Sequence, residues 1–316
     1  MNTSPDQEEL RQRRMIELIG RLAPSEGYTL SALDGIKFMR SNKPIPRTPA
    51  LYEPSIVVVC QGRKRGYLGD QVHTYDARHF LVLSVPLPFE SETIATAEEP
   101  LLAISIRINL AVAAELVLSL DEAHRHVAAP PVSMCSTPLD DKLSDAVLRL
   151  LEALMSPIDS SVLGPAIMRE IYFRVLTGEQ GPAIRAALTH QSHFGKISKA
   201  LRRIHADYAG DIDVDTLASE AGMSIAAFHA NFKGVTTTSP MQYLKTTRLH
   251  KARLLMIQDG LSAATAATRV GYESSSQFSR EFKRFFGRTP VEEATQMKNS
   301  LALMPAENTS RYVTVQ

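Results

Sequence analysis

Two segments fifty residues apart carry aromatic, short polar and basic side chains in the same order. Residues 222–240 read GMSIAAFHANFKGVTTTSP, and residues 271–290 read GYESSSQFSREFKRFFGRTP. A shift of fifty positions superposes their aromatic and lysine residues: Phe228 on Phe278, Phe232 on Phe282, and Lys233 on Lys283. Arginine can donate two hydrogen bonds to one guanine, and lysine can pair with a phosphate. The repeated segment is therefore suited to contacting a nucleic acid.

The residues around each copy predict a pair of short helices. Asp213 or Asp215 can cap a first helix, and Gly222 suits the left-handed turn that ends it. Ser224 can then cap a second helix. A helix, a short glycine-containing turn and a second helix form a helix-turn-helix. We expect these units at about residues 213–234 and 262–285.

The polar face of the second helix in each copy holds the candidate DNA contacts. Helical spacing predicts that Ile225, Phe228 and Phe232 are buried in the first copy and Phe278, Phe282 and Phe285 in the second. The candidate DNA-binding residues are Ala226, His229, Asn231, Lys233, Ser275, Ser276, Ser279, Arg280, Lys283 and Arg284. The alternative for the two units is a plain helical bundle with the phenylalanines as its core, and the alternative for Lys283 is a solvated side chain.

A segment of helical periodicity, SPMQYLKTTRLHKARLLMIQDG, joins the two copies. A helix of about 20 residues spans roughly 30 Å, and successive major-groove faces on one side of DNA lie about 34 Å apart. A rigid spacer of this length predicts that one chain contacts two neighbouring groove segments. Arg248 within it is expected to be a structural or phosphate-contacting residue rather than a base reader.

The charge is distributed unevenly along a chain whose net charge is only +1. Residues 196–290 carry 14 Lys/Arg and 8 Asp/Glu, a balance of +6, and the rest of the chain carries −5. This favours a polyanionic partner for the C-terminal third. Two cysteines without a CxxC spacing exclude a disulfide framework and a zinc site evident from the sequence. No signal peptide or membrane span is evident, so a cytoplasmic location is expected.

The N-terminal part has a sequence pattern typical of strands rather than of helices. After an expected helix at residues 6–22, residues 27–108 contain short β-branched or alternating runs broken by Gly, Pro and Asp. This spacing predicts a small antiparallel barrel or sandwich, with a hairpin turning at Gly69-Asp70. From about Asn109 the periodicity is helical, and an apolar stripe from Leu143 to Leu154 predicts either intradomain core or a dimer seam.

Residues 196–290 resemble the DNA-binding domain of AraC-family transcription regulators. The resemblance is carried by LASEAGMS, SPMQYLKTTRLHKARLLM and VGYESSSQFSREFKRFFGRTP, in that order and spacing. The N-terminal part, including SIVVVCQGRKRGYLGD, resembles the cupin-type domain of one subgroup of that family. The resemblance implies a one-component regulator whose barrel senses a ligand and whose helices, somewhere in residues 138–178, form a homodimer. Members often carry an arginine where Ala230 stands, so we expect Arg280 to make the stronger base contact.

The barrel offers a set of candidate effector-binding residues: Cys60, Arg65, Tyr67, His73 and Tyr75. Strand alternation predicts that His73 and Tyr75 point the same way. The spacing of His73 and His79 departs from that of metal cupins, so no metal or other cofactor is expected. Cys60 lies in an apolar strand, which favours inert packing over redox sensing. The adjoining GRKRG is expected to be a solvated turn.

Together these observations predict an α+β chain. Residues 1–180 form a cupin-like antiparallel β-barrel with flanking helices, residues 181–195 a linker, residues 196–296 an all-α domain with two helix-turn-helix units joined by a long helix, and residues 297–316 a tail. The expected function is that of a sequence-specific transcriptional regulator rather than an enzyme, with promoter DNA, a small-molecule effector, a second copy of itself and the transcription machinery as partners. A cupin-type metal enzyme with a fused helical domain and an effector-independent DNA-binding regulator are the alternatives.

Overall fold

The structure is a computed structural model that describes residues 5–123, 129–188 and 193–301. The chain divides into two compact units. The first holds Met1–Arg47, Glu53–Val85 and Ser91–Ser192, and the second holds Thr48–Tyr52, Pro86–Glu90 and His193–Gln316. Part of the segment expected as a linker is helical, because helix α6 occupies Gly181–Leu188. Residues 302–316 of the expected tail lie outside the described residues.

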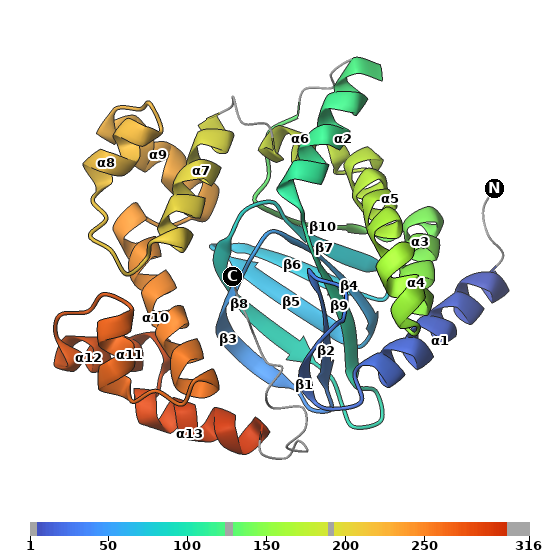
Figure 1. Cartoon of the computed structure of the whole chain (residues 1–316), viewed down its shortest axis with the longest axis horizontal. Helices are drawn as coiled ribbons and strands as arrows, with labels where there is room; N and C mark the ends of the chain where they lie inside the picture. Colours follow the sequence, from blue (N-terminus) through green and yellow to red (C-terminus); the bar gives the residue numbers. More distant parts are fainter. Residues whose placement is uncertain (1–4, 124–128, 189–192, 302–316) are drawn as a thin grey trace. The chain divides into compact units, whose positions relative to one another are not determined.

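A curled antiparallel sheet, open like a half-barrel, dominates the first part of the chain (Figure 1). Its strand order is β1-β2-β9-β4-β7-β6-β5-β8-β3, and β10 pairs with β7. The strands are β1 (Gly27–Leu30), β2 (Ile36–Ser41), β3 (Ile45–Tyr52), β4 (Ser55–Gln61), β5 (Arg63–Leu68), β6 (Gln71–Asp76), β7 (His79–Leu83), β8 (Leu87–Ile94), β9 (Leu101–Arg107) and β10 (Met134–Pro138). The expected α+β fold is confirmed.

Local sequence explains most of these strands. Leu68 pairs with Gln71, so the hairpin between β5 and β6 turns at Gly69-Asp70 as predicted, and Gly69 has a φ of 58°. Strand β10 was not predicted, because its pairing with β7 joins residues about 55 positions apart that share no local pattern.

The expectation of a solvated turn at GRKRG is wrong. Arg63–Leu68 forms strand β5, and the Lys64 side chain is only 3% exposed. Lys64 lies directly opposite Tyr75 on β6. Strand alternation places Lys64, Gly66 and Leu68 on one buried face, a consequence of pairing that the basic composition of the segment conceals.

Among the described residues, the first unit contains the helices α1 (Pro5–Leu22), α2 (Leu110–Ala123), α3 (Asp141–Ala153), α4 (Pro157–Val162), α5 (Gly164–Thr177) and α6. The expected apolar stripe lies on α3, where Leu143, Val147, Leu150 and Leu151 are buried in one core with residues of α1, α5 and the sheet. The stripe is therefore intradomain core rather than a dimer seam.

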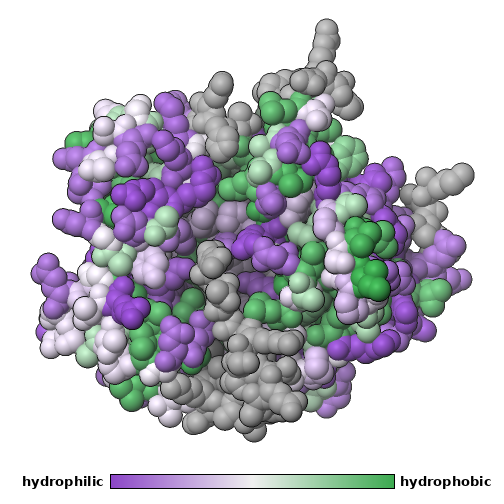
Figure 2. All heavy atoms as spheres, in the orientation of Figure 1, coloured by the Kyte–Doolittle hydropathy of each residue, from purple (hydrophilic) through white to green (hydrophobic). Residues whose placement is uncertain are grey.

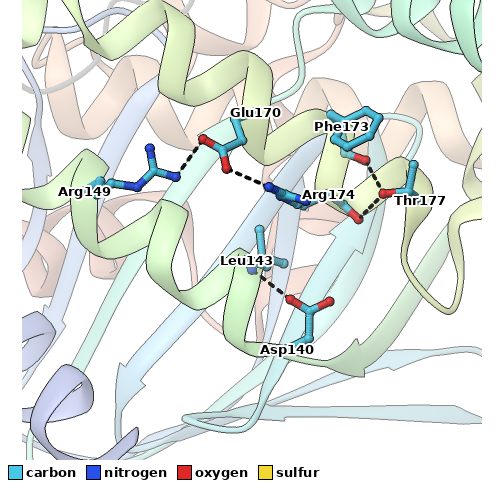
Figure 3. Close-up of polar contacts among 7 residues, drawn as sticks. All are labelled: Asp140, Leu143, Arg149, Glu170, Phe173, Arg174 and Thr177. Atoms are coloured by element: carbon cyan, nitrogen blue, oxygen red, sulfur yellow. Dashed lines mark hydrogen bonds and ion pairs between the residues drawn. The ribbon is translucent and has the colours of Figure 1, made fainter. Parts of the chain in front are cut away.

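An ion pair joins α3 to α5 outside this core (Figure 3). Glu170 of α5 lies 2.6 Å from the Arg149 guanidinium of α3 and 3.1 Å from that of Arg174, one turn along α5. The hydrogen bond from Arg149 lowers the pKa of Glu170, and the one from Arg174 adds to this effect. Asp140 caps α3 by accepting a hydrogen bond from the Leu143 N–H at 2.7 Å. Of these contacts, the Arg149–Glu170 pair connects the two helices.

The second unit contains seven helices within the described residues. They are α7 (His193–Ala206), α8 (Val214–Glu220), α9 (Ile225–Thr236), α10 (Pro240–Gln258), α11 (Ala263–Arg269), α12 (Ser275–Phe286) and α13 (Pro290–Leu301). Helices α8 and α9 form one pair, α11 and α12 form another, and α10 runs between the pairs (Figure 1). In the ranges that the structure describes, no helix is long and apolar enough to cross a membrane.

Candidate nucleic-acid interface

The first helix-turn-helix consists of α8 and α9, and its boundaries follow from local hydrogen bonds. The carboxylate of Asp213 accepts from the Thr216 N–H at 2.7 Å and begins α8. Gly222 adopts the left-handed conformation, with a φ of 60°, after the helix ends. Ser224 Oγ accepts from the Ala227 N–H at 3.3 Å and begins α9. The predicted helix, turn and helix are confirmed.

The second helix-turn-helix consists of α11 and α12. It repeats the design of the first, but its turn is one residue longer. Ser262 and Ser274 cap the two helices by accepting from the N–H groups of Thr265 and Gln277, at 3.1 and 3.2 Å. Gly271 has a φ of 86°, and a Cβ there would lie 2.5 Å from the carbonyl oxygen of Ala209. Glycine is therefore required at this turn for both backbone conformation and close approach.

The phenylalanines form the cores of both units. Phe228 and Phe232 are fully buried with ring centroids 5.5 Å apart, and Phe278 and Phe282 are fully buried with centroids 5.4 Å apart. The prediction that Ile225 is buried is wrong, because its side chain is 49% exposed. Ile225 is the first residue of α9, and the spacing rule does not account for a helix end that extends beyond the core.

Most of the candidate DNA contacts are exposed on α9 and α12. The exposed residues are Ala226, His229, Lys233, Ser275, Ser276, Arg280, Lys283 and Arg284. Asn231 and Ser279 are partly buried, and the Asn231 amide donates to the Ala227 carbonyl of its own helix at 2.8 Å. Ala230, the counterpart of Arg280, is also exposed.

Gln277 is a candidate that the sequence reasoning missed. It is exposed in the first turn of α12, and its amide lies 3.3 Å from Oε1 of Glu281. Glutamine can donate to and accept from the major-groove edge of adenine. Its position within SSSQFSR, between serines already chosen for the same helix face, was the available signal.

The carboxylate of Glu281 connects α12 to neighbouring parts of the fold. Glu281 accepts hydrogen bonds from Lys245 Nζ of α10 at 3.0 Å and from the Tyr272 hydroxyl at 2.8 Å. Burial alone would raise the pKa of Glu281, but hydrogen bonds from Lys245, Tyr272 and Gln277, together with the charge of Lys245, outweigh it and lower the pKa below its ordinary value. The carboxylate therefore stays ionised and ties α12 to the connecting helix.

Arg248 on α10 makes structural hydrogen bonds to the backbone, which is one of the two roles expected for it. Its Nε donates to the Tyr208 carbonyl at 2.7 Å, and its two Nη atoms donate to the carbonyls of Gly271 and Gly210 at 3.1 and 2.9 Å. One guanidinium thus joins the α7–α8 loop to the α11–α12 turn. With 19 residues, α10 spans about 28 Å at the usual rise per residue.

The five effector candidates separate onto different surfaces of the sheet. Tyr75 is fully buried and His73 is partly buried on the same side of β6, as alternation predicted. Arg65 and Tyr67 instead contact Glu92, at 3.4 and 2.6 Å. These two follow the opposite alternation from Lys64, so the structure does not bring the five residues together.

Cys60 is a buried thiol in this structure. It is buried at a bulge of β4, and burial raises the pKa of its thiol to about 12. Thiolate chemistry at Cys60 is therefore disfavoured. Within the described ranges, no group of three or more His, Cys, Asp or Glu side chains is arranged to hold a metal ion.

Two family profiles match the chain in the order of its two parts. Residues 32–183 match the AraC-type transcriptional regulator N-terminus, and residues 217–295 match a helix-turn-helix domain. The Msm operon regulatory protein of Streptococcus mutans is 23% identical over 168 residues, which are 52% of this chain and 60% of that protein. The HTH-type transcriptional regulator ArgR of Pseudomonas aeruginosa is 28% identical over 158 residues, 50% of this chain and 48% of that protein. The matched stretch thus spans about half of the length of these relatives.

Solved structures agree at the level of the fold. ToxT from Vibrio cholerae superposes with a TM-score of 0.59 at 11% identity, covering 82% of this chain and 99% of that one. The chain thus combines an N-terminal sheet domain with a C-terminal pair of helix-turn-helix units, and both profiles place it among the helix-turn-helix transcription regulators. The chain belongs to the AraC family, with an AraC-type N-terminal domain.

Proposed function

We propose that this protein is a sequence-specific regulator of transcription that binds promoter DNA through both helix-turn-helix units. The observation that carries the proposal is the presence of two capped units with buried phenylalanine cores, each presenting one exposed helix face, on either side of a single helix of 19 residues. That spacing is close to one turn of B-DNA, so α9 and α12 would enter successive major-groove segments.

Different residues serve different parts of the proposed contact. Arg280, with Ser275, Ser276, Ser279 and the additional Gln277, would read bases from α12, and Lys283 and Arg284 would contact phosphates. On α9, Ala226, His229 and Asn231 would contribute weaker contacts, and Lys233 would contact a phosphate. The second unit would therefore provide most of the base recognition.

The proposal gives the first part of the chain a regulatory role, with residues 1–180 as effector-responsive domain and residues 196–296 as DNA-binding domain. A solved ToxT structure holds an unsaturated fatty acid, which supports the proposal that this chain also responds to a small-molecule effector. An effector would act through different affinities for DNA-competent and DNA-incompetent states. We propose the cytoplasm as the place of action, because a promoter-binding protein must meet the transcription machinery there.

We also propose a homodimer, formed through the region of residues 138–178. Ile158, Val162 and Leu163, on and just after α4, are 74%, 68% and 50% exposed. Figure 2 shows apolar surface over the region of α4. A contiguous exposed apolar surface on a regulator is a candidate contact for a second copy.

The proposal is tested by selecting bound sequences from a randomised DNA library at two salt concentrations with the full chain. We expect an enriched motif in two parts whose centres lie about one helical turn apart. Binding that is salt-sensitive but enriches no sequence would show only electrostatic attraction and would contradict the proposal. Metal analysis and a turnover assay on the same preparation test the alternative function, a cupin-type metal enzyme. Bound metal together with turnover would favour that alternative.

A further inference from the structure

An exposed amide in the first turn of α12 is held by a carboxylate of the same helix. Gln277 is exposed, and its Nε2 donates a hydrogen bond to Oε1 of Glu281, about one turn further along, at 3.3 Å. In the first helix-turn-helix the equivalent positions hold Ala227 and Asn231, and the Asn231 amide donates to the Ala227 backbone carbonyl instead. The paired amide and carboxylate therefore distinguish α12 from α9.

Glu281 is itself fixed by groups outside α12. Its Oε1 also accepts from Lys245 Nζ of α10 at 3.0 Å, and its Oε2 accepts from the Tyr272 hydroxyl at 2.8 Å. The Glu281 side chain is only 13% exposed, and its lowered pKa keeps it ionised at neutral pH. An ionised carboxylate accepts hydrogen bonds and cannot donate them. The fold thus places a fixed acceptor beside Gln277.

This acceptor determines which end of the Gln277 amide faces it. The amide nitrogen must face Glu281, because an amide oxygen there would meet a second acceptor. A primary amide carries two N–H groups, and the one on the far side from the oxygen can be donated to Glu281 while the other stays beside Oε1. The free edge of Gln277 then offers one donor and one acceptor side by side.

That edge is complementary to one base in the major groove. Adenine presents the N7 acceptor and the N6 amino donor, whereas guanine presents two acceptors, N7 and O6. Against adenine, the free edge of Gln277 makes two hydrogen bonds. Against guanine, its oxygen would face O6, and the amide cannot turn to donate twice while Glu281 holds its nitrogen.

We propose that Gln277 selects adenine over guanine in the DNA half-site bound by the second helix-turn-helix, and that Glu281 is the positioning residue that enforces this selection. The inference rests on the proposed function, since it assigns a base to the DNA that α12 would contact. Arg280 lies three residues beyond Gln277 and is also exposed. We therefore expect the adenine close to the guanine that Arg280 would contact.

The test uses the full chain and the operator selected from the randomised library. Repeating the selection with Gln277→Ala identifies the base pair whose preference depends on this side chain. Fluorescence anisotropy then gives the Kd for operators in which that adenine is replaced by guanine, by 7-deazaadenine, which lacks the N7 acceptor, or by purine, which lacks the N6 amino group.

Three further variants separate positioning of the amide from general support of α12. Glu281→Ala removes the acceptor, and Glu281→Gln keeps an oxygen that Lys245 holds beside Gln277. Tyr272→Phe removes a contact to Oε2 but leaves Oε1 in place. The melting temperature of each variant is measured alongside its DNA binding.

We expect the parent to prefer adenine over guanine about 5- to 150-fold at that base pair, and to bind each analogue about ten-fold more weakly than adenine. Glu281→Ala should reduce the preference for adenine at least about five-fold, because the freed amide can donate twice to guanine. Glu281→Gln should retain most of the preference. Tyr272→Phe should lower the melting temperature and leave the preference unchanged.

Three results would overturn the inference: no base pair whose preference depends on Gln277, a preference there for a base other than adenine, or an undiminished preference for adenine in Glu281→Ala. Equal losses of preference in Tyr272→Phe and Glu281→Ala would also overturn it, because Glu281 would then only support the helix. In each of these cases an enriched two-part operator leaves the proposed function standing. Failure of the parent to enrich any operator would instead refute the proposed function, and the inference with it.

Discussion

At the scale of single residues, α9 and α12, the two helices proposed to contact DNA, differ at one pair of equivalent positions. Arg280 and Ala230 are both exposed, fifty residues apart, but only Arg280 can bond two acceptors of one guanine. The repeat therefore presents a strong and a weak version of the same helix face.

We predict that Arg280→Ala weakens binding to the selected operator about 5- to 150-fold and relaxes base preference at one position. Ala230→Arg should strengthen binding or add preference in the other half of the motif. Fluorescence anisotropy against the operator and its single-base variants measures both effects. No change in affinity or site preference for Ala230→Arg would contradict the assignment of the weaker contact to α9.

A second residue-scale difference lies at the ends of α9 and α12. Both helices end in the left-handed conformation, α12 at Gly287 with a φ of 77° and α9 at Thr237 with a φ of 63°. Within the described residues, Thr237 is the only residue other than glycine with a positive φ. A β-branched residue is strained in this conformation.

We predict that Thr237→Gly raises the free energy of unfolding by about 0.5–1 kcal/mol, because relief of strain exceeds the added chain entropy of glycine. The reverse change, Gly287→Thr, should lower it by about 1–2 kcal/mol, since a Cβ there meets no atom within 4 Å and only the backbone is strained. Urea unfolding measures both. Destabilisation by Thr237→Gly would show that the Thr237 hydroxyl, 2.6 Å from the Thr236 carbonyl, matters more than the strain.

At the scale of elements, α10 positions the parts of the second unit through buried and bridging side chains. Arg248 joins two loops through three backbone carbonyls, and lysine cannot reproduce that planar fork. We predict that Arg248→Lys lowers the free energy of unfolding by about 2 kcal/mol and speeds hydrogen exchange near residues 208–211 and 270–272. Arg269→Lys, at an exposed position of α11, is the control. Unchanged hydrogen exchange in both loops would contradict the prediction that Arg248 holds them together.

His250, also on α10, makes the packing of this helix sensitive to acid. Its ring lies edge-on to Phe285 and Phe286, with centroids 5.4 and 5.3 Å away, and Nε2 has no hydrogen-bond partner in the described part of the chain. Burial, with smaller contributions from Arg253 and His205, lowers the pKa of His250 to about 3. The unfolded chain, with a histidine pKa of about 6.5, therefore takes up this proton first as the pH falls.

We predict that the stabilising contribution of neutral His250 is complete above pH 6.5 and declines by about 1.4 kcal/mol per pH unit toward pH 3. His250→Leu should reduce the loss of stability between pH 7 and pH 5 by about 2 kcal/mol. His229→Ala, at an exposed position, should leave that loss unchanged. Urea unfolding at the two pH values decides, and equal losses in His250→Leu and the parent would contradict the prediction.

At the scale of the whole molecule, the uneven charge predicts how binding depends on salt. The basic balance of residues 196–290 is opposed by an acidic remainder, so attraction to DNA arises from a few placed cations rather than from net charge. We predict that the double variant Lys233→Ala/Lys283→Ala lowers the slope of log affinity against log salt by about 1.8. Lys142→Ala, exposed on α3, should not alter it. An unchanged slope in the double variant would remove both lysines from the phosphate contacts.

The sequence by itself determined the local structure of the helix-turn-helix units. The caps at Asp213 and Ser224, the turn at Gly222 and the buried phenylalanines all act between residues fewer than eight positions apart, so their spacing predicts their structure. The same locality allowed the β5–β6 hairpin and the antiparallel character of the sheet to be predicted.

Only the tertiary structure decided which residues are buried by distant partners. The Leu143–Leu154 stripe fitted core and dimer seam equally until α1 and α5 were seen to cover it. Lys64 stands in a basic segment typical of a solvated turn, but its burial depends on Tyr75 and Thr93, on strands that pair with β5 in the folded sheet. Burial is set by contacts between residues far apart in the chain, and local composition carries no record of them.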